Sequence, residues 1–571
     1  MKNAINFFLI AFLLYVQTAC QKSGTGQNYI IQKSTIADSA MVVSPHPLAS
    51  EIGVEILRQG GNAVDAAVAV QFALAVVYPR AGNIGGGGFM VIRTAEGSYA
   101  ALDYREKAPK LAHRDMYLDE TGEVVPDLST AGHLAVGVPG TVDGLFAAHE
   151  KFGNIKDLKT LIQPAIELAE DGFSVTTEEA DRLNRFQEAF RKHNAKPNAF
   201  FKDEWQAGDL LKQTDLANTL KRILINGSAG FYEGETADKI VAEMERGNGL
   251  ISHDDLKSYR AKWRTPIVGE YKNYKVVSMP PSSSGGIALL QMLEMVEDYP
   301  LSEWGFHDPR SIHLMAEAMR RAYADRAEFL GDMDFYPVPI DSLLDDTYLR
   351  ARMANFNPDS ASVSSSILAG NFEVALESYE TTHTSVVDAR GNAGSVYTTL
   401  SSNYGSKVVV EGAGFFLNNE MDDFSAKPGV PNQFGLIGAE ANAVQPEKRM
   451  LSSMTPTIVE KEGNLFMVLG TPGGSTIITA VFQVFLNVAE FGMPLDQAVS
   501  SPRFHHQWLP DRIMIEKETL DTNTILALKA MGHNFHRVTS IAKVKAIHVL
   551  PDGKLHGAAD PRNTDDDAKG Y

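Results

Sequence analysis

A threonine at the start of an expected strand is the residue of this sequence best suited to nucleophilic chemistry. Thr381 stands in the run Glu380-Thr-Thr-His-Thr-Ser385, between a serine-rich stretch at 359–366 and a strand-like stretch at 385–400. If the chain were cut before Thr381, the new N-terminal residue would hold a hydroxyl nucleophile and an α-amine base together. That amine titrates at roughly 7.7–8.0, so it accepts a proton near neutral pH without a histidine. We therefore hypothesise cleavage between Glu380 and Thr381.

A pair of glycines could stabilise the negative charge that such an attack creates. Gly473 and Gly474 lie in Thr471-Pro-Gly-Gly-Ser475, which joins an expected buried strand to an expected buried helix. Because glycine has no Cβ, backbone N–H groups here can face a ligand, as an oxyanion hole requires. The N-terminus of the following helix adds a dipole that favours negative charge.

Charged residues that could hold a substrate occur at two places. Arg105 follows an expected strand at 99–104, and its planar guanidinium suits a carboxylate, although a surface ion pair is also possible. The segment 417–424, Leu-Asn-Asn-Glu-Met-Asp-Asp-Phe, combines amides with acids. It could bind an ammonium group or a metal ion, or it could form a solvated turn, and the sequence leaves these alternatives open.

Two other motifs argue against common kinds of site. The glycine-rich run at 82–88 follows an expected helix and precedes a strand, the reverse of the order in a dinucleotide-binding loop. It favours backbone that packs closely under an active site. Adjacent histidines point in different directions on most backbones, so His505 and His506 are not expected to form a metal site. We expect neither a cofactor nor a metal.

The N-terminus indicates export. Lys2 precedes an apolar segment at 7–16, which is too short to span a bilayer comfortably and is typical of a signal peptide. The segment ends at Gln17-Thr-Ala-Cys20, which resembles a bacterial lipoprotein signal, although an ordinary secretory signal is the alternative. We expect a signal peptide at 1–19, a tether at 20–30 lipidated on Cys20, and a membrane-anchored periplasmic protein. The formal net charge of −19 argues against a nucleic-acid partner.

The elements that would position these residues include both strands and helices. We expect strands at 39–44, 99–104, 266–277, 454–459, 465–470 and 512–516. We expect helices at 48–58, 63–77, 311–330 and 475–490, with a mostly helical region between 141 and 330. This distribution favours one layered α+β domain over two independent domains.

Together these motifs resemble the γ-glutamyltranspeptidase family of N-terminal-nucleophile hydrolases. The resemblance covers residues 39–571, and its markers occur in the family's order at 44–49, 60–67, 85–88, 381–385, 418–424, 451–454 and 472–475. It implies an α+β fold, a four-layer αββα sandwich. It also implies self-cleavage into a large subunit, 31–380, and a small subunit, 381–571, which form a heterodimer around one core.

The resemblance further implies a role for each motif. Thr381 would attack the γ-amide carbonyl of glutathione or another γ-glutamyl compound, and Thr399 would position the new N-terminus. Water, or the amine of an amino acid or dipeptide, would then accept the γ-glutamyl group. Gly473 and Gly474 would form the oxyanion hole. The substrate's α-carboxylate would be held by Arg105, Ser452 and Ser453, and its α-ammonium group by Ser401, Glu420 and Asp423.

Two features depart from the pattern of many bacterial members. Ser401 and Glu420 stand where those members have Asn and Gln, which affects the expected balance between hydrolysis and transfer. The segment 428–438 resembles the bacterial lid loop, with Phe434 in place of a tyrosine. Phe434 keeps the ring of that residue and loses its hydroxyl, so any gating hydrogen bond from this position is lost.

Two other functions are kept as alternatives. One is an acylase of the same superfamily that cleaves glutaryl-type amides, but such a substrate has no α-ammonium group and would leave Asp423 unpaired. The other is a lipid-anchored binding protein without turnover. The presence of Thr381, Thr399 and the glycine pair argues against it.

Overall fold

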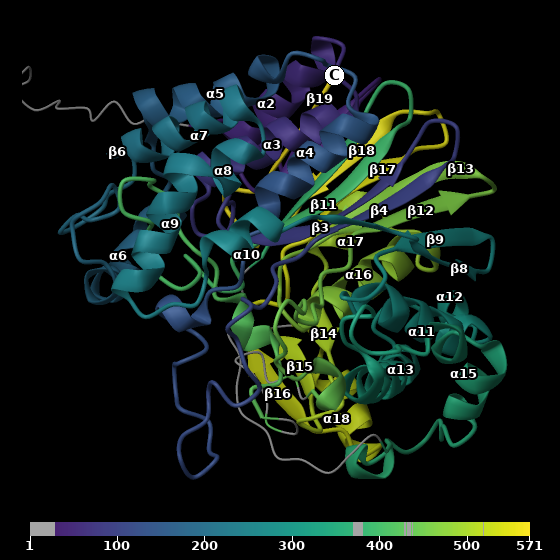
Figure 1. The fold of residues 1–571 in the computed structure, drawn as a ribbon. Coiled ribbons are helices and arrows are strands. Elements are labelled where there is room, and N and C mark those ends of the chain that lie inside the picture. Colours follow the sequence, from purple (N-terminus) through teal and green to yellow (C-terminus); the bar gives the residue numbers. More distant parts are fainter. Residues whose placement is uncertain (1–28, 369–380, 428–429, 431–435, 437, 518) are drawn as a thin grey trace, which may run out of the picture.

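Two antiparallel sheets of seven strands each lie face to face in the middle of the molecule (Figure 1). The computed structural model describes residues 29–368, 381–427, 430, 436, 438–517 and 519–571. The first sheet consists of β1 (Ser34–Ala37), β18 (Leu555–Ala559), β17 (Lys545–Val549), β13 (Asn464–Gly470), β12 (Thr457–Lys461), β9 (Tyr274–Ser278) and β8 (Ile267–Tyr271). The second consists of β19 (Asp567–Gly570), β2 (Met41–Ser44), β10 (Thr382–Val387), β11 (Ala393–Thr399), β3 (Gly87–Arg93), β4 (Tyr99–Tyr104) and β7 (Lys262–Arg264).

Helices pack on the outer face of each sheet (Figure 1). The helices on the side of the second sheet are α2 (Pro47–Arg58), α3 (Ala63–Val77), α4 (Thr141–Phe152), α5 (Leu158–Asp171), α6 (Thr177–His193), α7 (Thr214–Asn226), α8 (Ala229–Tyr232), α9 (Gly234–Arg246) and α10 (His253–Ser258). The helices on the side of the first sheet are α11 (Gly285–Glu297), α12 (Leu301–Trp304), α13 (Pro309–Phe329), α14 (Ile340–Leu343), α15 (Asp346–Met353), α16 (Thr476–Ala489), α17 (Leu495–Ser500) and α18 (Thr522–Ala530).

Smaller sheets and 3₁₀ turns are separate from the two large sheets. A three-stranded sheet is formed by β14 (Phe504–His505), β15 (Ile513–Glu516) and β16 (Phe535–Val538), and a two-stranded one by β5 (Phe173–Ser174) and β6 (Leu210–Leu211). Short 3₁₀ turns occur at η1 (His133–Ala135), η2 (Ser364–Ser366), η3 (Glu420–Asp423) and η4 (Glu440–Asn442).

Alternating side chains along the strands build separate apolar layers. In β3, Met90 and Ile92 pack against the outer helices, whereas Phe89 and Val91 pack between the two sheets. Because successive residues of a strand point to opposite faces, a strand covered on both sides has to be apolar on both. The expected four-layer αββα sandwich is confirmed by this arrangement.

Segments from both sides of Thr381 interleave in both sheets. In the second sheet β10 pairs with β2 and with β11, which in turn pairs with β3. In the first sheet β12 pairs with β9. Each sheet therefore needs strands from before and after the expected cleavage point, and the two parts share one core.

Most expected elements occur where the sequence placed them. The apolar helix at 63–77 is α3, which begins with a capping box formed by Asn62 and Asp65 and is buried along its whole length. The prediction of a single strand at 266–277 is wrong. The segment is a hairpin of β8 and β9, because Lys272 adopts a φ of 52° and reverses the chain.

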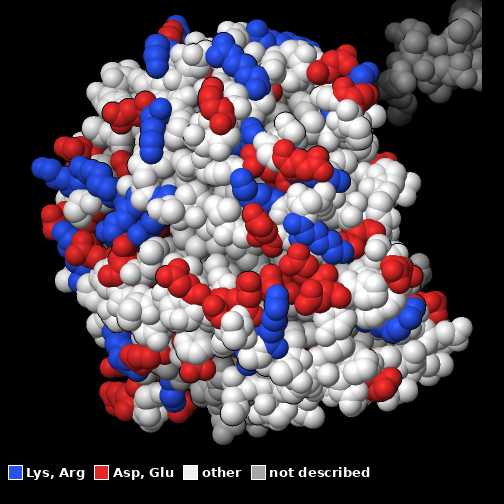
Figure 2. Space-filling model, turned by 90° about the vertical axis from the view of Figure 1, so that its right-hand side faces the viewer, with Lys and Arg blue, Asp and Glu red and all other residues white. Residues whose placement is uncertain are grey.

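Charged residues of both signs are interspersed on the molecular face seen in Figure 2. That face has no broad basic surface of the kind that binds a polyphosphate backbone. Within the described part of the chain, no helix is both long and apolar enough to cross a bilayer.

Candidate functional site

Thr381 lies directly before β10, and its side chain lines a pocket where several strands end. In the β10–β11 ladder Thr382 is opposite Thr398, so the backbones of Thr381 and Thr399 are neighbours. The pocket brings together residues from segments far apart in sequence: Arg105, Arg326, Thr381, Thr399, Ser401, Glu420, Asp423, Leu436, Leu451, Ser452, Ser453, Met454, Gly474 and Ile477. All the sequence-predicted site residues that the structure describes are among them, except Gly473, which adjoins Gly474.

The glycine-rich run packs against the backbone of Thr399. A Cβ on Gly86 would lie 2.0 Å from the carbonyl oxygen of Thr399, a distance that no side chain can occupy. The same carbonyl accepts a hydrogen bond of 2.8 Å from Asn83 Nδ2, and the Thr399 hydroxyl accepts one of 2.8 Å from the Ser401 amide. The expectation that this run packs closely under the site is confirmed.

Gly473 and Gly474 form the turn between β13 and α16. Their φ angles are 149° and 53°, in the region that favours glycine. A Cβ on Gly473 would lie 2.7 Å from Thr476 Oγ1, which donates a hydrogen bond of 2.7 Å to the Gly473 carbonyl. The turn therefore lies in the same pocket as Thr381, at the start of a buried helix, an arrangement suited to developing negative charge.

Arg105 is the centre of a buried charge cluster. Its Nη1 lies 2.5 Å from Glu420 Oε2, and its Nη2 donates to Asp423 Oδ2. Burial alone would lower the pKa of Arg105, but Glu420, Asp423 and Glu106 together raise it above its ordinary value. The guanidinium is therefore permanently charged, and it is 1% exposed.

More carboxylates than cations surround Arg105. Burial raises the pKa of Glu106 and of Glu420 to about 7, against the lowering effect of Arg105. Burial and the Glu420 charge also raise the pKa of Asp423. The cluster can therefore accept one further cation, because a second positive charge would let these carboxyls ionise together.

The structure excludes the surface alternative for both charged motifs. Glu420 is fully buried in η3, and the Asp423 side chain is only 13% exposed, so the segment is not a solvated turn. Arg105 lies in a buried cluster rather than in a surface ion pair. A cation and two anions side by side suit a small zwitterion.

Ser452 and Ser453 close the pocket on the side of α11 and α13. The Ser452 carbonyl accepts hydrogen bonds of 2.8 Å from the Ser284 amide and 2.7 Å from its hydroxyl. Ser453 Oγ accepts one of 3.2 Å from Arg326 Nη2. In the same pocket, Ser401 adopts a φ of 72°, a strained conformation for a serine that is typical of functional sites.

A second guanidinium in the pocket, that of Arg326, was not predicted from the sequence. Arg326 lies in the last turn of α13, and only 4% of it is exposed. Its position four residues after Ala322 and three after Tyr323, both buried, places it on the apolar face of this helix. That pattern is the signal that could have revealed it.

The family model described as gamma-glutamyltranspeptidase matches residues 49–570. The chain belongs to the γ-glutamyltranspeptidase family. A glutathione hydrolase proenzyme of Escherichia coli (strain K12) is 46% identical to it, over 94% of this chain and 92% of the relative. The resemblance inferred from the motifs is thus confirmed.

Two solved structures extend the comparison. The gamma-glutamyltranspeptidase of Helicobacter pylori is 48% identical and matches 60% of this chain and 97% of its own, with a TM-score of 0.57. A cephalosporin acylase from Bacillus halodurans is 26% identical and matches 95% of this chain and 98% of its own, with a TM-score of 0.81. The fold is therefore common to transpeptidases and acylases.

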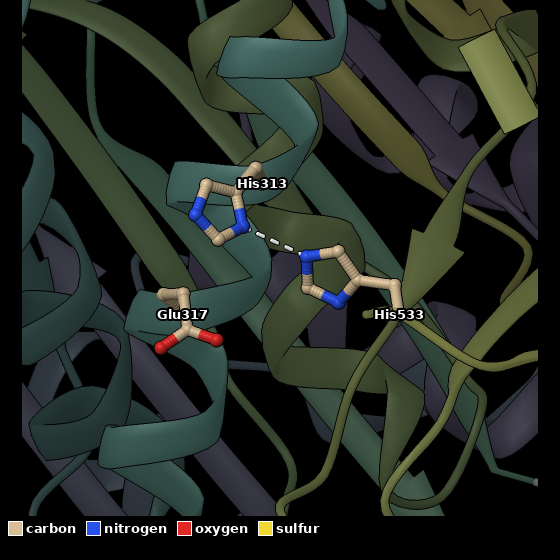
Figure 3. A group of neighbouring side chains, drawn as sticks. All are labelled: His313, Glu317 and His533. Atoms are coloured by element: carbon tan, nitrogen blue, oxygen red, sulfur yellow. Dashed lines mark hydrogen bonds between the residues drawn. The ribbon is translucent and has the colours of Figure 1, made fainter. Parts of the chain in front are cut away.

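In this member of the family, one buried group outside the pocket has the residue types of a metal site. The ligand atoms of His313, Glu317 and His533 lie within 4.8 Å of one another (Figure 3). However, Glu317 Oε2 accepts a bond of 2.6 Å from Arg321, and Glu317 Oε1 accepts one of 3.2 Å from Arg320. Two guanidiniums already neutralise this carboxylate and would repel a metal ion, so the residues fit a structural network better.

The adjacent histidines have separate partners. The two ring nitrogens of His505 lie 2.8 Å from Thr479 Oγ1 and 2.8 Å from Gln507 Oε1. His506 Nδ1 accepts a bond of 3.1 Å from the Trp508 amide. Three sequence-predicted residues, Cys20, Glu380 and Phe434, lie outside the described residues.

Proposed function

We propose that this protein is a self-processing enzyme that hydrolyses or transfers the γ-glutamyl group of glutathione and related compounds. Its family and its 46% identity to a glutathione hydrolase proenzyme support this activity. The observation that carries the proposal is the pocket itself, in which Thr381 lies with Arg105, Glu420 and Asp423. This set combines a nucleophile with the two charges that a glutamyl head group needs.

Activation requires one covalent step. Hydrolysis of the Glu380–Thr381 peptide bond consumes one water and leaves Thr381 with a free α-amine. That amine is the general base of the mature enzyme. Because β10 and β11 remain paired with β2 and β3, the large and small subunits stay together after the cut.

The mature enzyme then forms an ester. Thr381 Oγ attacks the γ-carbonyl carbon while the α-amine takes the hydroxyl proton. The tetrahedral oxyanion accepts hydrogen bonds from the backbone amides of Gly473 and Gly474. When the intermediate collapses, the C–N bond breaks and the proton passes to the leaving amine. The γ-glutamyl group is now attached to Thr381 through an ester bond.

The ester is resolved by the same groups. The α-amine takes a proton from water, or from the amine of an amino acid or dipeptide, as that acceptor attacks the ester carbonyl. The C–O bond breaks, the proton returns to Thr381 Oγ, and glutamate or a new γ-glutamyl compound leaves. Thr399, adjacent to Thr381 in the ladder, holds the amine in position.

Substrate binding replaces ion pairs within the protein by ion pairs with the substrate. The substrate's α-carboxylate binds Arg105 with Ser452 and Ser453, and its α-ammonium group binds Glu420, Asp423 and Ser401. The Arg105–carboxylate contacts are then replaced by contacts of the same charge types with the substrate. A ligand that lacks either charge leaves a buried group unpaired, which costs free energy.

A Thr381→Ala variant tests the processing step. The wild-type chain is expected to yield two fragments on a denaturing gel, the smaller beginning Thr-Thr-His-Thr, and the variant a single band. Thr382→Val is the matched control, because the Thr382 hydroxyl has no hydrogen-bond partner among the described residues. A single band for the wild type would refute self-processing.

An acylase acting on glutaryl-type amides is the second candidate, favoured by the similarity to the Bacillus halodurans cephalosporin acylase. The buried acids Glu420 and Asp423 oppose it, because a glutaryl group offers them no cation. Comparing turnover of γ-glutamyl-p-nitroanilide and glutaryl-p-nitroanilide separates the two. Faster turnover of the glutaryl compound would overturn our assignment.

We further infer that the protein is exported and anchored in the periplasm through a lipid on Cys20. The basis is the sequence alone: Lys2, the apolar segment at 7–16 and the only cysteine of the chain at its end. Cys20→Ser is expected to move the protein from the membrane fraction to the soluble fraction. Equal membrane association of both forms would refute the anchor.

A further inference from the structure

Two buried guanidiniums line the pocket, and among the described residues only one of them forms an ion pair with a carboxylate. Arg105 is ion-paired with Glu420 and Asp423. Arg326 forms no ion pair with any Asp or Glu of the described residues, and its guanidinium donates hydrogen bonds to two serine hydroxyl groups. An unpaired buried charge costs several kcal/mol, so its retention beside the nucleophile calls for a physical reason.

The hydrogen bonds of Arg326 fix both serines that face the pocket. Its Nη2 donates to Ser453 Oγ at 3.2 Å, and its Nε donates to Ser284 Oγ at 3.0 Å. Ser284 Oγ in turn donates to the Ser452 carbonyl at 2.7 Å. One guanidinium therefore holds Ser453 directly and Ser452 through one intermediate.

This bond also sets the direction of the Ser453 hydroxyl. A guanidinium can only donate, so Ser453 Oγ accepts from Arg326 and its own hydrogen is directed elsewhere. Its remaining hydrogen is available to a carboxylate oxygen in the pocket. The positive charge behind the hydroxyl makes that donation stronger.

Arg326 remains charged at neutral pH despite its burial. Burial lowers its pKa to about 10, with Tyr323 and Asp423 acting in the opposite direction. The C-terminal end of α13, where Arg326 lies, compensates part of its charge through the helix dipole. The rest of the charge acts on the pocket.

We propose that Arg326 is the positioning residue that makes the Ser452–Ser453 side of the pocket specific for the donor's α-carboxylate. It acts through the Ser453 hydroxyl and supplies a positive charge that forms no ion pair with a carboxylate of the described residues. Arg105 forms ion pairs with the same acids that bind the substrate's ammonium group, whereas Arg326 forms no ion pair with them and stays available to the carboxylate. This inference rests on the proposed γ-glutamyl activity.

The test compares a carboxylate donor with its neutral ester in an Arg326→Gln variant. Loss of a charge-assisted hydrogen bond, worth about 1.5–3 kcal/mol, corresponds to a fall of roughly 10- to 150-fold. We expect that fall in kcat/KM for γ-glutamyl-p-nitroanilide and less than about threefold for its α-methyl ester. Arg310→Gln, exposed at the start of the same helix, is expected to change neither value by more than twofold.

The outcomes separate this inference from the proposed function. Equal losses for both donors would make Arg326 a merely structural residue, and no loss would show that its charge is not used. Either result overturns the inference while wild-type turnover upholds the activity. Wild-type protein inactive on both donors would overturn both proposals. If Arg326→Gln fails to process, Arg326→Met, which buries no polar group, gives the same comparison.

Discussion

Replacing Asp423 by Asn removes the charge expected to hold the substrate's ammonium group while keeping the shape of the side chain. Asp423 Oδ2 accepts a hydrogen bond from Arg105, next to Glu420. The asparagine amide cannot attract an ammonium group as a carboxylate does. The change lies on the substrate side of the pocket and leaves Thr381 in place.

The size of the effect follows from the type of contact that is lost. A hydrogen bond to a charged group contributes about 1.5–3 kcal/mol, and each ~1.4 kcal/mol is a factor of ten. We therefore expect kcat/KM for γ-glutamyl-p-nitroanilide to fall roughly 10- to 150-fold. Glutaryl-p-nitroanilide has no ammonium group, so its kcat/KM is expected to change by less than about threefold.

The assay follows p-nitroaniline release from both compounds with the processed enzyme. A denaturing gel that shows both fragments checks folding. Asp422→Asn is the matched control, because Asp422 is also buried but accepts a bond of 2.6 Å from Ser129 Oγ and does not line the pocket. An unchanged ratio of the two kcat/KM values in Asp423→Asn would refute the assigned role.

Three further predictions concern the glycine turn at Gly473, the buried acid Glu420 and the core residue Trp508. Gly473→Ala is expected to lower kcat roughly 10²–10³-fold, because a Cβ there lies 2.7 Å from Thr476 Oγ1 at a φ of 149°; unchanged kcat would contradict this. Since the pKa of Glu420 is raised to about 7 and only its ionised form pairs with ammonium, the inhibition constant of glutamate should rise about tenfold per pH unit below 7; a constant value between pH 5 and 7 would refute it. Trp508→Phe removes indole bonds of 2.9 Å to the Ser364 carbonyl and 3.1 Å to the Ile367 carbonyl, so unfolding free energy should fall by about 1–3 kcal/mol, measured by denaturant titration. An unchanged midpoint would show that these bonds are dispensable.

Local patterns in the sequence were enough to place Thr381 at the start of a strand and the glycine pair between a strand and a helix. Thr381 precedes a strand whose residues are buried on both faces, and Gly473-Gly474 separates a buried strand from a buried helix. Both features depend on short-range properties, namely side-chain periodicity and the conformational freedom of glycine. The hairpin within 266–277 was missed, because its two-residue turn, Lys272-Asn273, contains no glycine or proline and only one residue type that favours turns.

The sequence by itself determined the residue types of the site, the family they resemble and the presence of a layered α+β fold. Only the tertiary structure decided that the acids of 420–423 are buried, that they contact Arg105, and that Arg326 enters the same pocket. The physical reason is the distance along the chain over which each effect acts. Periodicity and turn chemistry act over a few residues, whereas burial and charge pairing depend on contacts such as that between Arg105 and Asp423, which are 318 positions apart.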